Sequence, residues 1–196
     1  MFVDILNTDK KYKIIYADPP WSYNDKKCNG ACEPHYSTMK IKDICKLPVK
    51  ELADDDSVLF LWTTYPMMQE ALALIEAWGF KYKSIGFQWI KLNKKALEFN
   101  IGKADNLLDL FKAVCFFGLG RWTRGNSECC LIATKGKPKR VSASVGQLIF
   151  SPLARHSEKP AEAREKIVEL MGGELPRIEL FAREEIKGWD CWGNEV

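Results

Sequence analysis

Four consecutive residues, Asp18-Pro19-Pro20-Trp21, place an acid, two prolines and an indole directly after the apolar run at 14–17. Each proline lacks an N–H and holds the residue before it in extended backbone, so the chain is stiff here. Asp18 and the Pro19 carbonyl can each accept one hydrogen of an amine, and Trp21 can stack on a flat ring, which contributes about 1–3 kcal/mol per base. The sequence therefore predicts a rigid pocket for a planar base with an exocyclic amine.

Adenine is a base of this kind, and its exocyclic nitrogen is a poor nucleophile because the lone pair is delocalised into the ring. Two acceptors on the amine hydrogens favour the sp³-like geometry that frees this pair, so that a methyl group can be transferred by direct displacement. The alternative is a simple turn after a strand, since Asp and Pro are common turn residues. The strand before the motif and the loop after it favour the catalytic interpretation.

The chain has 196 residues, 46% hydrophobic and 28% charged, which suffices for one sizeable core, so we expect a single domain over residues 1–196. No apolar run approaches the roughly 20 residues that cross a bilayer, and the N-terminus lacks a signal-peptide pattern. We therefore expect a cytosolic or nuclear protein with no membrane partner. The net charge of +3 is too small to indicate nucleic-acid binding by itself.

The seven cysteines include the adjacent Cys129 and Cys130 in a strand-like run, which fits reduced thiols better than a disulfide framework. Cys28, Cys32 and His35 lie close in sequence, but their spacing is a poor match to a zinc knuckle and no second Cys-x₂-Cys half exists. We predict no metal site.

Strand-like segments alternate with helical patterns along the chain. Strands are predicted at 13–17, 58–63, 83–90, 129–133, 147–150 and 177–181. Helices are predicted at 66–78, with Pro in the first turn and Gly79 at the end, and at 159–171, before Gly172. This alternation predicts an α/β fold, a mostly parallel sheet with helices on both faces, and a ligand site at the carboxyl ends of its strands.

Two less regular regions carry open alternatives. Leu107, Leu108, Leu110 and Phe111 form a helical pattern that indicates either a short core or interface helix or a lid over the substrate; we favour packing, because apolar helical spacing usually reflects packing. The basic loop Lys135–Arg140 is either a phosphate contact or a solvated turn.

Further motifs follow residues 18–21 along the chain. They are Tyr36-x-Thr38-Met39, Leu59-Phe60-Leu61-Trp62, Trp89-Ile90-Lys91, Gly120-x-Trp122, Glu128-x-Cys130-Leu131, Lys135-Gly136-x-Pro138, His156-x-x-Lys159-Pro160, the run Ile178–Arg183 and Trp192-Gly193-Asn194. Together these motifs resemble the S-adenosylmethionine-dependent adenine-N6 methyltransferases that include the eukaryotic mRNA adenosine methyltransferase and its bacterial and phage relatives. The resemblance covers nearly the whole chain. The catalytic loop comes first and the cofactor strand last, which resembles the permuted β class and implies a Rossmann-like methyltransferase fold with permuted motif order.

The resemblance also implies roles for single residues. It assigns Asp18 and Pro19 to the target amine, within the catalytic motif that Pro20 and Trp21 complete. The substrate residues that it implies are Tyr36, Trp122, Arg124 and Asn126. The residues that it implies for the cofactor, S-adenosylmethionine, are Asp4, Ile5, Asp18, Lys159, Phe181, Arg183, Asn194 and Glu195.

Physical arguments support parts of this assignment. A cation near the start of a helix is disfavoured by the helix dipole, so Lys159 is expected to have a partner such as the cofactor carboxylate or the ribose hydroxyls. The carboxylate of Glu195 can accept hydrogen bonds from ribose hydroxyls. Ala182 stands where the family usually has a glycine, and it must tolerate close approach of the cofactor.

The expected function is therefore methyl transfer from S-adenosylmethionine to the N6 amine of adenine in nucleic acid. DNA is preferred over RNA because a compact chain resembles the bacterial and phage members, which places the enzyme in the cytoplasm of a bacterium or a phage-infected cell. Methylation of cytosine is disfavoured, since in the resemblance it goes with Ser in place of Asp18. A catalytically silent nucleic-acid-binding subunit is the other alternative, and the intact motif argues against it. A homodimer or heterodimer can add surface for sequence recognition.

Overall fold

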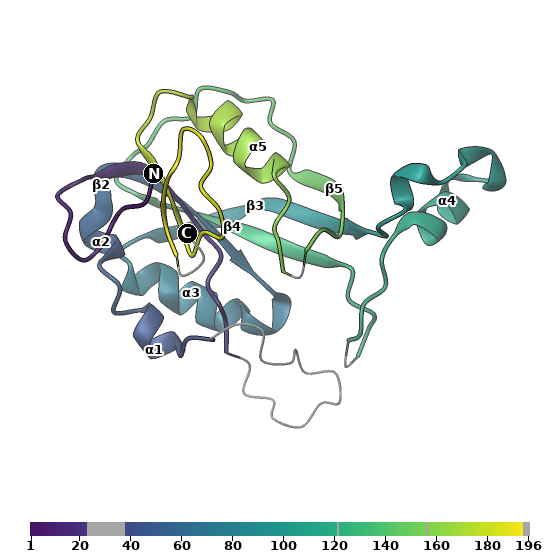
Figure 1. Cartoon of the computed structure of the whole chain (residues 1–196), viewed down its shortest axis with the longest axis horizontal. Coiled ribbons are helices and arrows are strands. Elements are labelled where there is room, and N and C mark those ends of the chain that lie inside the picture. Colours follow the sequence, from purple (N-terminus) through teal and green to yellow (C-terminus); the bar gives the residue numbers. More distant parts are fainter. Residues whose placement is uncertain (23–37, 121, 156, 194–196) are drawn as a thin grey trace.

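The computed structural model describes residues 1–22, 38–120, 122–155 and 157–193. Within these residues the centre of the fold is a seven-stranded sheet in the order β5-β3-β4-β2-β1-β6-β7 (Figure 1). Among the described strands, β4 runs against its two neighbours and all other pairs are parallel. The strands are β1 (Tyr12–Ala17), β2 (Ala53–Thr63), β3 (Lys81–Leu92), β4 (Ser127–Lys135), β5 (Leu148–Pro152), β6 (Arg177–Leu180) and β7 (Asp190–Trp192).

Side chains alternate between the two faces of the sheet, and each face has its own hydrophobic core. On one face Ile15, Leu59 and Leu131 pack in a core that includes residues of α1, α2 and α3. On the other face Tyr16 and Phe60 belong to a core that includes the apolar side of α5. The helices are α1 (Ile41–Ile44), α2 (Val49–Leu52), α3 (Met68–Ala77), α4 (Leu107–Val114) and α5 (Glu162–Met171).

The predicted Rossmann-like α/β fold, with a mostly parallel sheet and helices on both faces, is confirmed. The six predicted strands are present, and most extend further than predicted. The prediction missed β7, whose three residues pair in parallel with β6, and the four-residue helices α1 and α2. Elements this short have too little sequence pattern to be recognised and form because the neighbouring structure holds them.

The two predicted helices begin later than the sequence pattern indicated. The first is divided into a 3₁₀ turn, Tyr65–Met67, and then α3, and Gly79 follows it with a φ of +80°. The second was predicted from Lys159, but α5 begins at Glu162. Pro160 disfavours helical backbone at the residue before it, which keeps Lys159 outside the helix.

Helix α4 lies on an arm, residues 93–126, that connects β3 to β4 and extends beyond the sheet (Figure 1). The side chain of Asn106 caps the helix by accepting a hydrogen bond from the Asp109 N–H. Leu107 and Leu108 are 67% and 63% exposed, and Phe111 contacts the ring of Phe150 on β5. The helix is therefore not a core helix, and the interface and lid interpretations stay predictions. Two further 3₁₀ turns, Ala96–Glu98 and Ile101–Lys103, precede it on the arm.

The described part of the chain has no helix with the length and apolarity needed to span a bilayer. Cys129 and Cys130 are buried free thiols in β4. The Cys28, Cys32 and His35 group lies outside the described residues.

Gly136, which follows β4, should not tolerate a side chain. Its φ is +64°, and an added Cβ would lie 2.2 Å from the Asp55 carbonyl oxygen. We expect Gly136→Ala to lower the free energy of unfolding, measured in urea, by about 1–3 kcal/mol. Gly125→Ala is the matched control, because its Cβ would meet nothing within 4 Å, and it should change stability by less than about 0.5 kcal/mol. Equal stability of the two variants would contradict this account of the turn.

Candidate active site

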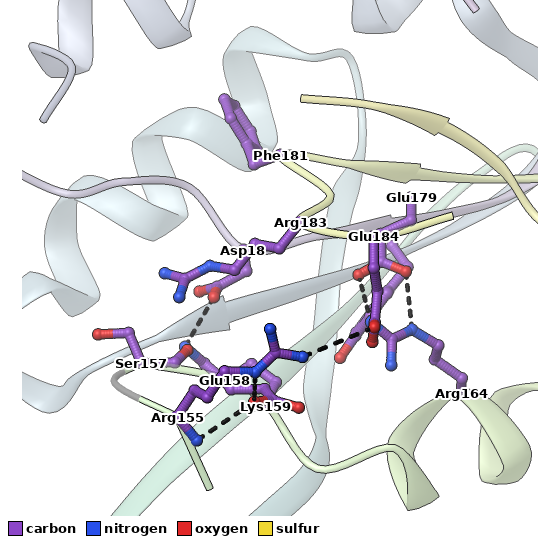
Figure 2. A pocket seen from close by; sticks show the side chains of 11 residues that line it. Asp18, Arg155, Ser157, Glu158, Lys159, Arg164, Glu179, Phe181, Arg183 and Glu184 are labelled. Carbon is purple, nitrogen blue, oxygen red and sulfur yellow. Dashed lines mark hydrogen bonds and ion pairs between the residues drawn. The ribbon is translucent and has the colours of Figure 1, made fainter. Parts of the chain in front are cut away.

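Asp18 follows β1 at the carboxyl edge of the sheet, where three parallel strands end together. Ala17 pairs with Leu61 of β2 on one side and with Leu180 of β6 on the other. A cleft at this edge encloses about 580 Å³, a volume that includes space open to solvent. Its lining comes from β1, β6, α5 and the segments beside them, as Figure 2 shows: Tyr16, Asp18, Arg155, Ser157, Glu158, Lys159, Arg164, Glu179, Phe181, Arg183 and Glu184.

The residues after Asp18 form a tight turn. The Trp21 N–H donates to the Pro19 carbonyl at 2.9 Å, and the Met39 N–H donates to the Pro20 carbonyl at 3.0 Å. The Pro19 carbonyl, predicted to accept a hydrogen of the amine, therefore already accepts one hydrogen bond within the turn. A carbonyl oxygen has two lone pairs, so it can still accept a second.

Trp21 packs inward from this turn. It is only 8% exposed, belongs to the core beneath α3, and donates from its indole N–H to the Trp62 carbonyl at 3.3 Å. Such a position secures the turn that carries Asp18. The predicted stacking of Trp21 on a base stays a prediction.

Lys159 lies between two carboxylates. Its ammonium donates to Asp18 Oδ2 at 2.8 Å (Figure 2) and is 3.4 Å from Glu128 Oε2. It also donates to the Ser157 carbonyl at 3.3 Å and lies 5.8 Å from the centroid of the Trp62 ring. The side chain is 11% exposed, so a largely desolvated cation is compensated on several sides. The expected contact of Lys159 with the cofactor stays a prediction, and its contacts with Asp18 and Glu128 were not predicted.

Glu128, the second residue of β4, extends this pairing across the sheet. Its carboxylate accepts from Lys91 on β3 as well as contacting Lys159. Asp18, Lys159, Glu128 and Lys91 thus form a chain of alternating charges from β1 to β3. We name these four residues the charge chain.

Glu128 and Lys91 were not predicted as site residues, although both lie in motifs of the resemblance. A signal was available, because each charged residue adjoins an apolar run, Lys91 after Trp89-Ile90 and Glu128 before the run 129–132. Glu128 pairs with Trp89 in the antiparallel ladder, which places Lys91 at a diagonal position. Opposite charges at such positions attract one another.

The charge chain shifts the pKa values of its members in different directions. Burial raises the pKa of Asp18, although Lys159 opposes this rise. Burial would lower the pKa of Lys159, but Asp18 and Glu128 outweigh it and raise the pKa. Burial would raise the pKa of Glu128, but Lys159 and Lys91 hold it below its ordinary value. Lys159 and Glu128 are therefore held in their charged forms, whereas Asp18 gains a proton more readily than an exposed carboxyl group.

A second buried ion pair fixes the opposite wall of the cleft. Arg164 of α5 donates to both carboxylate oxygens of Glu179 on β6, at 2.7 and 2.8 Å (Figure 2). Its guanidinium lies 5.9 Å from the centroid of the Tyr16 ring. This bidentate pair holds α5 on β6, beside the strand end that leads to Phe181.

Strained backbone gathers at the cleft. Phe181 and Ser157 have φ values of +62° and +58°, the two non-glycine residues of the described chain in this region, and both line the cleft. Such conformations cost about 1–3 kcal/mol and are common at ligand sites. Close backbone approach occurs at Gly193, whose added Cβ would lie 2.1 Å from the Ala182 carbonyl oxygen.

The predicted cofactor residues fall into three groups. Asp18, Lys159, Phe181 and Arg183 line one cleft. Asp4 and Ile5 do not line it: Asp4 is exposed and accepts hydrogen bonds from the Leu6 N–H and the Asn7 amide, while Ile5 is buried in the core. Asn194 and Glu195 lie outside the described residues. All these roles stay predictions.

Three of the four predicted substrate residues lie on the arm: Trp122, Arg124 and Asn126. Trp122 is 98% exposed, and Arg124 donates to the Phe117 carbonyl at 3.2 Å. The Asn126 carbonyl accepts from the Lys91 N–H at 2.8 Å, which places it beside the charge chain. Tyr36 lies outside the described residues. These roles also stay predictions.

The basic loop Lys135–Arg140 lies far from the cleft along the sheet. Lys135 pairs with Ser57 near the start of β2, whereas Asp18 lies beside the end of β2. The topology therefore separates this loop from the edge that carries Asp18 and argues against a contact with the target nucleotide.

Comparison with known proteins gives one family and several relatives. The model of the MT-A70 family matches residues 12–195. The type II methyltransferase M.MunI of Mycoplasma sp is 34% identical, over 95% of this chain and 78% of the relative. An N(6)-adenosine-methyltransferase MT-A70-like protein of Arabidopsis thaliana is 27% identical over 99% of this chain, and an N(6)-adenine-specific methyltransferase of Homo sapiens is 27% identical over 98%. The chain spans only 24% and 39% of the length of these last two.

Removing the charge of Glu128 should destabilise the fold in a pH-dependent way. We expect Glu128→Gln to lower the free energy of unfolding at neutral pH by about 1–3 kcal/mol, because charge-assisted hydrogen bonds are lost. The folded-state pKa lies below the ordinary value of 4.5, so this stabilisation is complete above that value and is lost as pH falls through the folded pKa. The difference between wild type and variant should therefore shrink in acid.

Urea unfolding at several pH values measures this difference. Glu162→Gln is the matched control, because Glu162 is 43% exposed and forms an i,i+4 pair with Lys166; such helix pairs are worth about 0.3–0.5 kcal/mol. A difference that grows in acid, or a control effect as large as that of Glu128→Gln, would contradict the role of Glu128.

Proposed function

This chain belongs to the MT-A70 family, and from that premise we propose that it transfers a methyl group from S-adenosylmethionine to the N6 amine of adenine in DNA. The observation that carries the proposal is the position of Asp18. Its carboxylate lines a cleft at the carboxyl edge of the sheet, paired with Lys159 and beside Phe181 and Arg183.

The donor groups of the cleft fit S-adenosylmethionine. Lys159 and Arg183 are cations suited to its carboxylate, and Glu179 and Glu184 are carboxylates suited to its ammonium group and ribose hydroxyls. Phe181 adds an aromatic ring for the adenine moiety. When bound, the cofactor supplies a methyl group made electrophilic by its positive sulfonium.

Asp18 and Pro19 hold the acceptor amine in this proposal. Lys159 is bonded to Asp18 Oδ2, so a carboxylate lone pair turned away from the lysine and the second lone pair of the Pro19 carbonyl are the acceptors for the two amine hydrogens. This arrangement orients the nitrogen lone pair for displacement. Asp18 positions the amine, and it can take the proton after methylation, when the nitrogen has become more acidic.

DNA is the substrate that we favour. The relative of 34% identity is a type II methyltransferase, and the chain spans 78% of its length, whereas it spans 24% of the plant relative, whose name specifies adenosine. RNA is the alternative that this second similarity supports. In a duplex the target base must leave the stack, at a cost of a few kcal/mol.

Three expectations belong to the same proposal. The 196 residues form a single methyltransferase domain. The enzyme acts in the cytoplasm of a bacterium or a phage-infected cell. A homodimer or heterodimer extends the surface that recognises DNA.

Labelled S-adenosylmethionine provides the direct test. The purified protein should methylate adenine-containing DNA, and adenine-free oligonucleotides should remain unlabelled; parallel single-stranded, double-stranded and RNA substrates distinguish the alternatives. Asp18→Asn and Asp18→Ala should lower kcat about 10²- to 10³-fold, because a preorganised polar contact to the reacting group is lost. Circular dichroism checks that the variants fold.

Asp43→Asn is the control, because Asp43 lies on α1, does not line the cleft, and forms an exposed ion pair with Lys46. Its kcat should equal that of the wild type. Cofactor binding without methylation of any substrate would instead support a silent subunit, and full activity of Asp18→Ala would refute the proposed site.

The pH dependence of kcat tests the state of Asp18. The carboxylate must be ionised to accept the amine hydrogens, so kcat should fall as pH falls, and burial should place this acid limb above the ordinary pKa of 3.8. Lys159 opposes the rise in pKa, so Lys159→Met, at saturating cofactor, should move the limb to higher pH. A limb that stays in place or moves to lower pH would contradict this coupling.

A further inference from the structure

Tyr65 lies at the same edge of the sheet as Asp18. It begins the 3₁₀ turn Tyr65–Met67, two residues after β2 ends at Thr63. Because β1 and β2 are parallel, with Ala17 opposite Leu61, both strands end at the edge of the sheet that carries the cleft. Tyr65 is 51% exposed, so an aromatic surface faces solvent beside the catalytic motif.

The ring of Tyr65 is anchored by its hydroxyl group. The hydroxyl is 2.6 Å from Ser127 Oγ and accepts from Gln88 Nε2 at 2.8 Å. Gln88 Nε2 also donates to the Glu128 carbonyl at 2.9 Å. Two strands therefore fix the polar end of a side chain whose ring remains exposed. A ligand that stacks on this ring loses little rotamer entropy, because the ring is already ordered.

The same contacts connect Tyr65 to the charge chain. Ser127 directly precedes Glu128, so their side chains lie on opposite faces of the sheet at the same edge. Ser127 is bonded to Tyr65 on one face, and on the other the Glu128 carboxylate contacts Lys159, which is bonded to Asp18. The position of the ring is thus fixed relative to Asp18 through the paired strands β2, β3 and β4.

Charge on the neighbouring arm indicates the kind of partner. Residues 93–126 contain four Lys and two Arg against one Glu and two Asp, a net charge of +3, which equals that of the whole chain. The arm joins β4 at Ser127, the residue bonded to Tyr65. An exposed aromatic ring beside the positively charged part of a protein is the combination that holds a single nucleic-acid strand, by stacking and by attraction of phosphates.

We propose that Tyr65 stacks on the base of a nucleotide that neighbours the target adenine. This inference rests on the proposed function and adds a residue that contacts substrate. A target base that leaves the stack deprives its neighbour of a stacking partner, and the anchored ring replaces that partner. Tyr65 thereby holds the strand in place while Asp18 holds the amine.

The test uses a duplex oligonucleotide that contains the sequence methylated by the wild-type enzyme, as mapped on unmodified plasmid DNA. Tyr65→Ala should raise Kd and KM about 5- to 150-fold, the range that corresponds to the loss of one stacked base, with kcat changed less than about threefold. Tyr65→Phe keeps the ring but loses the hydroxyl group that anchors it, so Kd and KM should rise less than in Tyr65→Ala. Tyr82→Ala is the matched control, since Tyr82 is 41% exposed and pairs with Ala133 at the opposite end of β4; it should behave as wild type.

Abasic substitutions in the oligonucleotide identify the stacked base. Replacing one base next to the target by an abasic residue should weaken binding by the wild type but not by Tyr65→Ala, so the two changes are not additive. The salt dependence of Kd should stay the same in Tyr65→Ala, because no phosphate contact is removed. Wild-type affinity of Tyr65→Ala, or additive effects at every neighbouring base, would overturn the inference while leaving the proposed function intact. Failure of the wild type to methylate DNA or RNA would overturn both.

Discussion

The ion pair between Lys159 and Asp18 is the interaction on which the site depends. It joins the end of β1 to the segment before α5, two parts of the chain 141 residues apart, at 2.8 Å. A largely buried ammonium needs compensation on several sides, and Glu128, the Ser157 carbonyl and the Trp62 ring supply it. Because Glu128 also binds Lys91, the position of Asp18 is set by side chains from β3 and β4 as well as by its own strand.

Buried ion pairs of this kind contribute little net stability, because desolvation costs nearly as much as attraction returns. Their value here lies in chemistry. In the proposed function, Asp18 loses water when it binds the amine closely. Desolvation alone favours its protonated form, which is a poorer hydrogen-bond acceptor than the carboxylate. Lys159 opposes that shift, and Glu128 in turn keeps Lys159 charged. The alternation of charges thus limits the rise in the pKa of Asp18 that burial causes.

Six strands and the place of Asp18 at the end of one of them could be predicted from the sequence, because apolar strand-like runs and an Asp-Pro-Pro-Trp motif are strong local signals. The order of the strands in the sheet was not predicted. Other features depend on tertiary contacts that no local pattern records. Trp21 was predicted to stack on a base but packs under α3. Glu128 lies at the end of a strand, and the sequence does not show that it contacts Lys159. Leu107 and Leu108 have the spacing of core residues but lie on the arm, where the described chain offers too little structure to cover them. Periodicity tells which side chains share a face, but not whether anything packs against that face.

The reversed direction of β4 explains how one edge of the sheet can serve both cofactor and substrate. In an all-parallel sheet only the ends of strands reach the carboxyl edge, and the following connections run back along the faces. Here β3 ends and β4 begins at that edge, because the two strands are antiparallel. The connection between them, the positively charged arm, therefore extends from the catalytic edge, and the loop after β4 lies at the opposite one. Ser127 and Glu128 lie at this edge because β4 begins there, and Tyr65 lies there because it follows the end of β2. On the other side of β1, β6 and α5 complete the cleft. A single antiparallel strand is thus sufficient to place the proposed nucleic-acid surface next to the cleft.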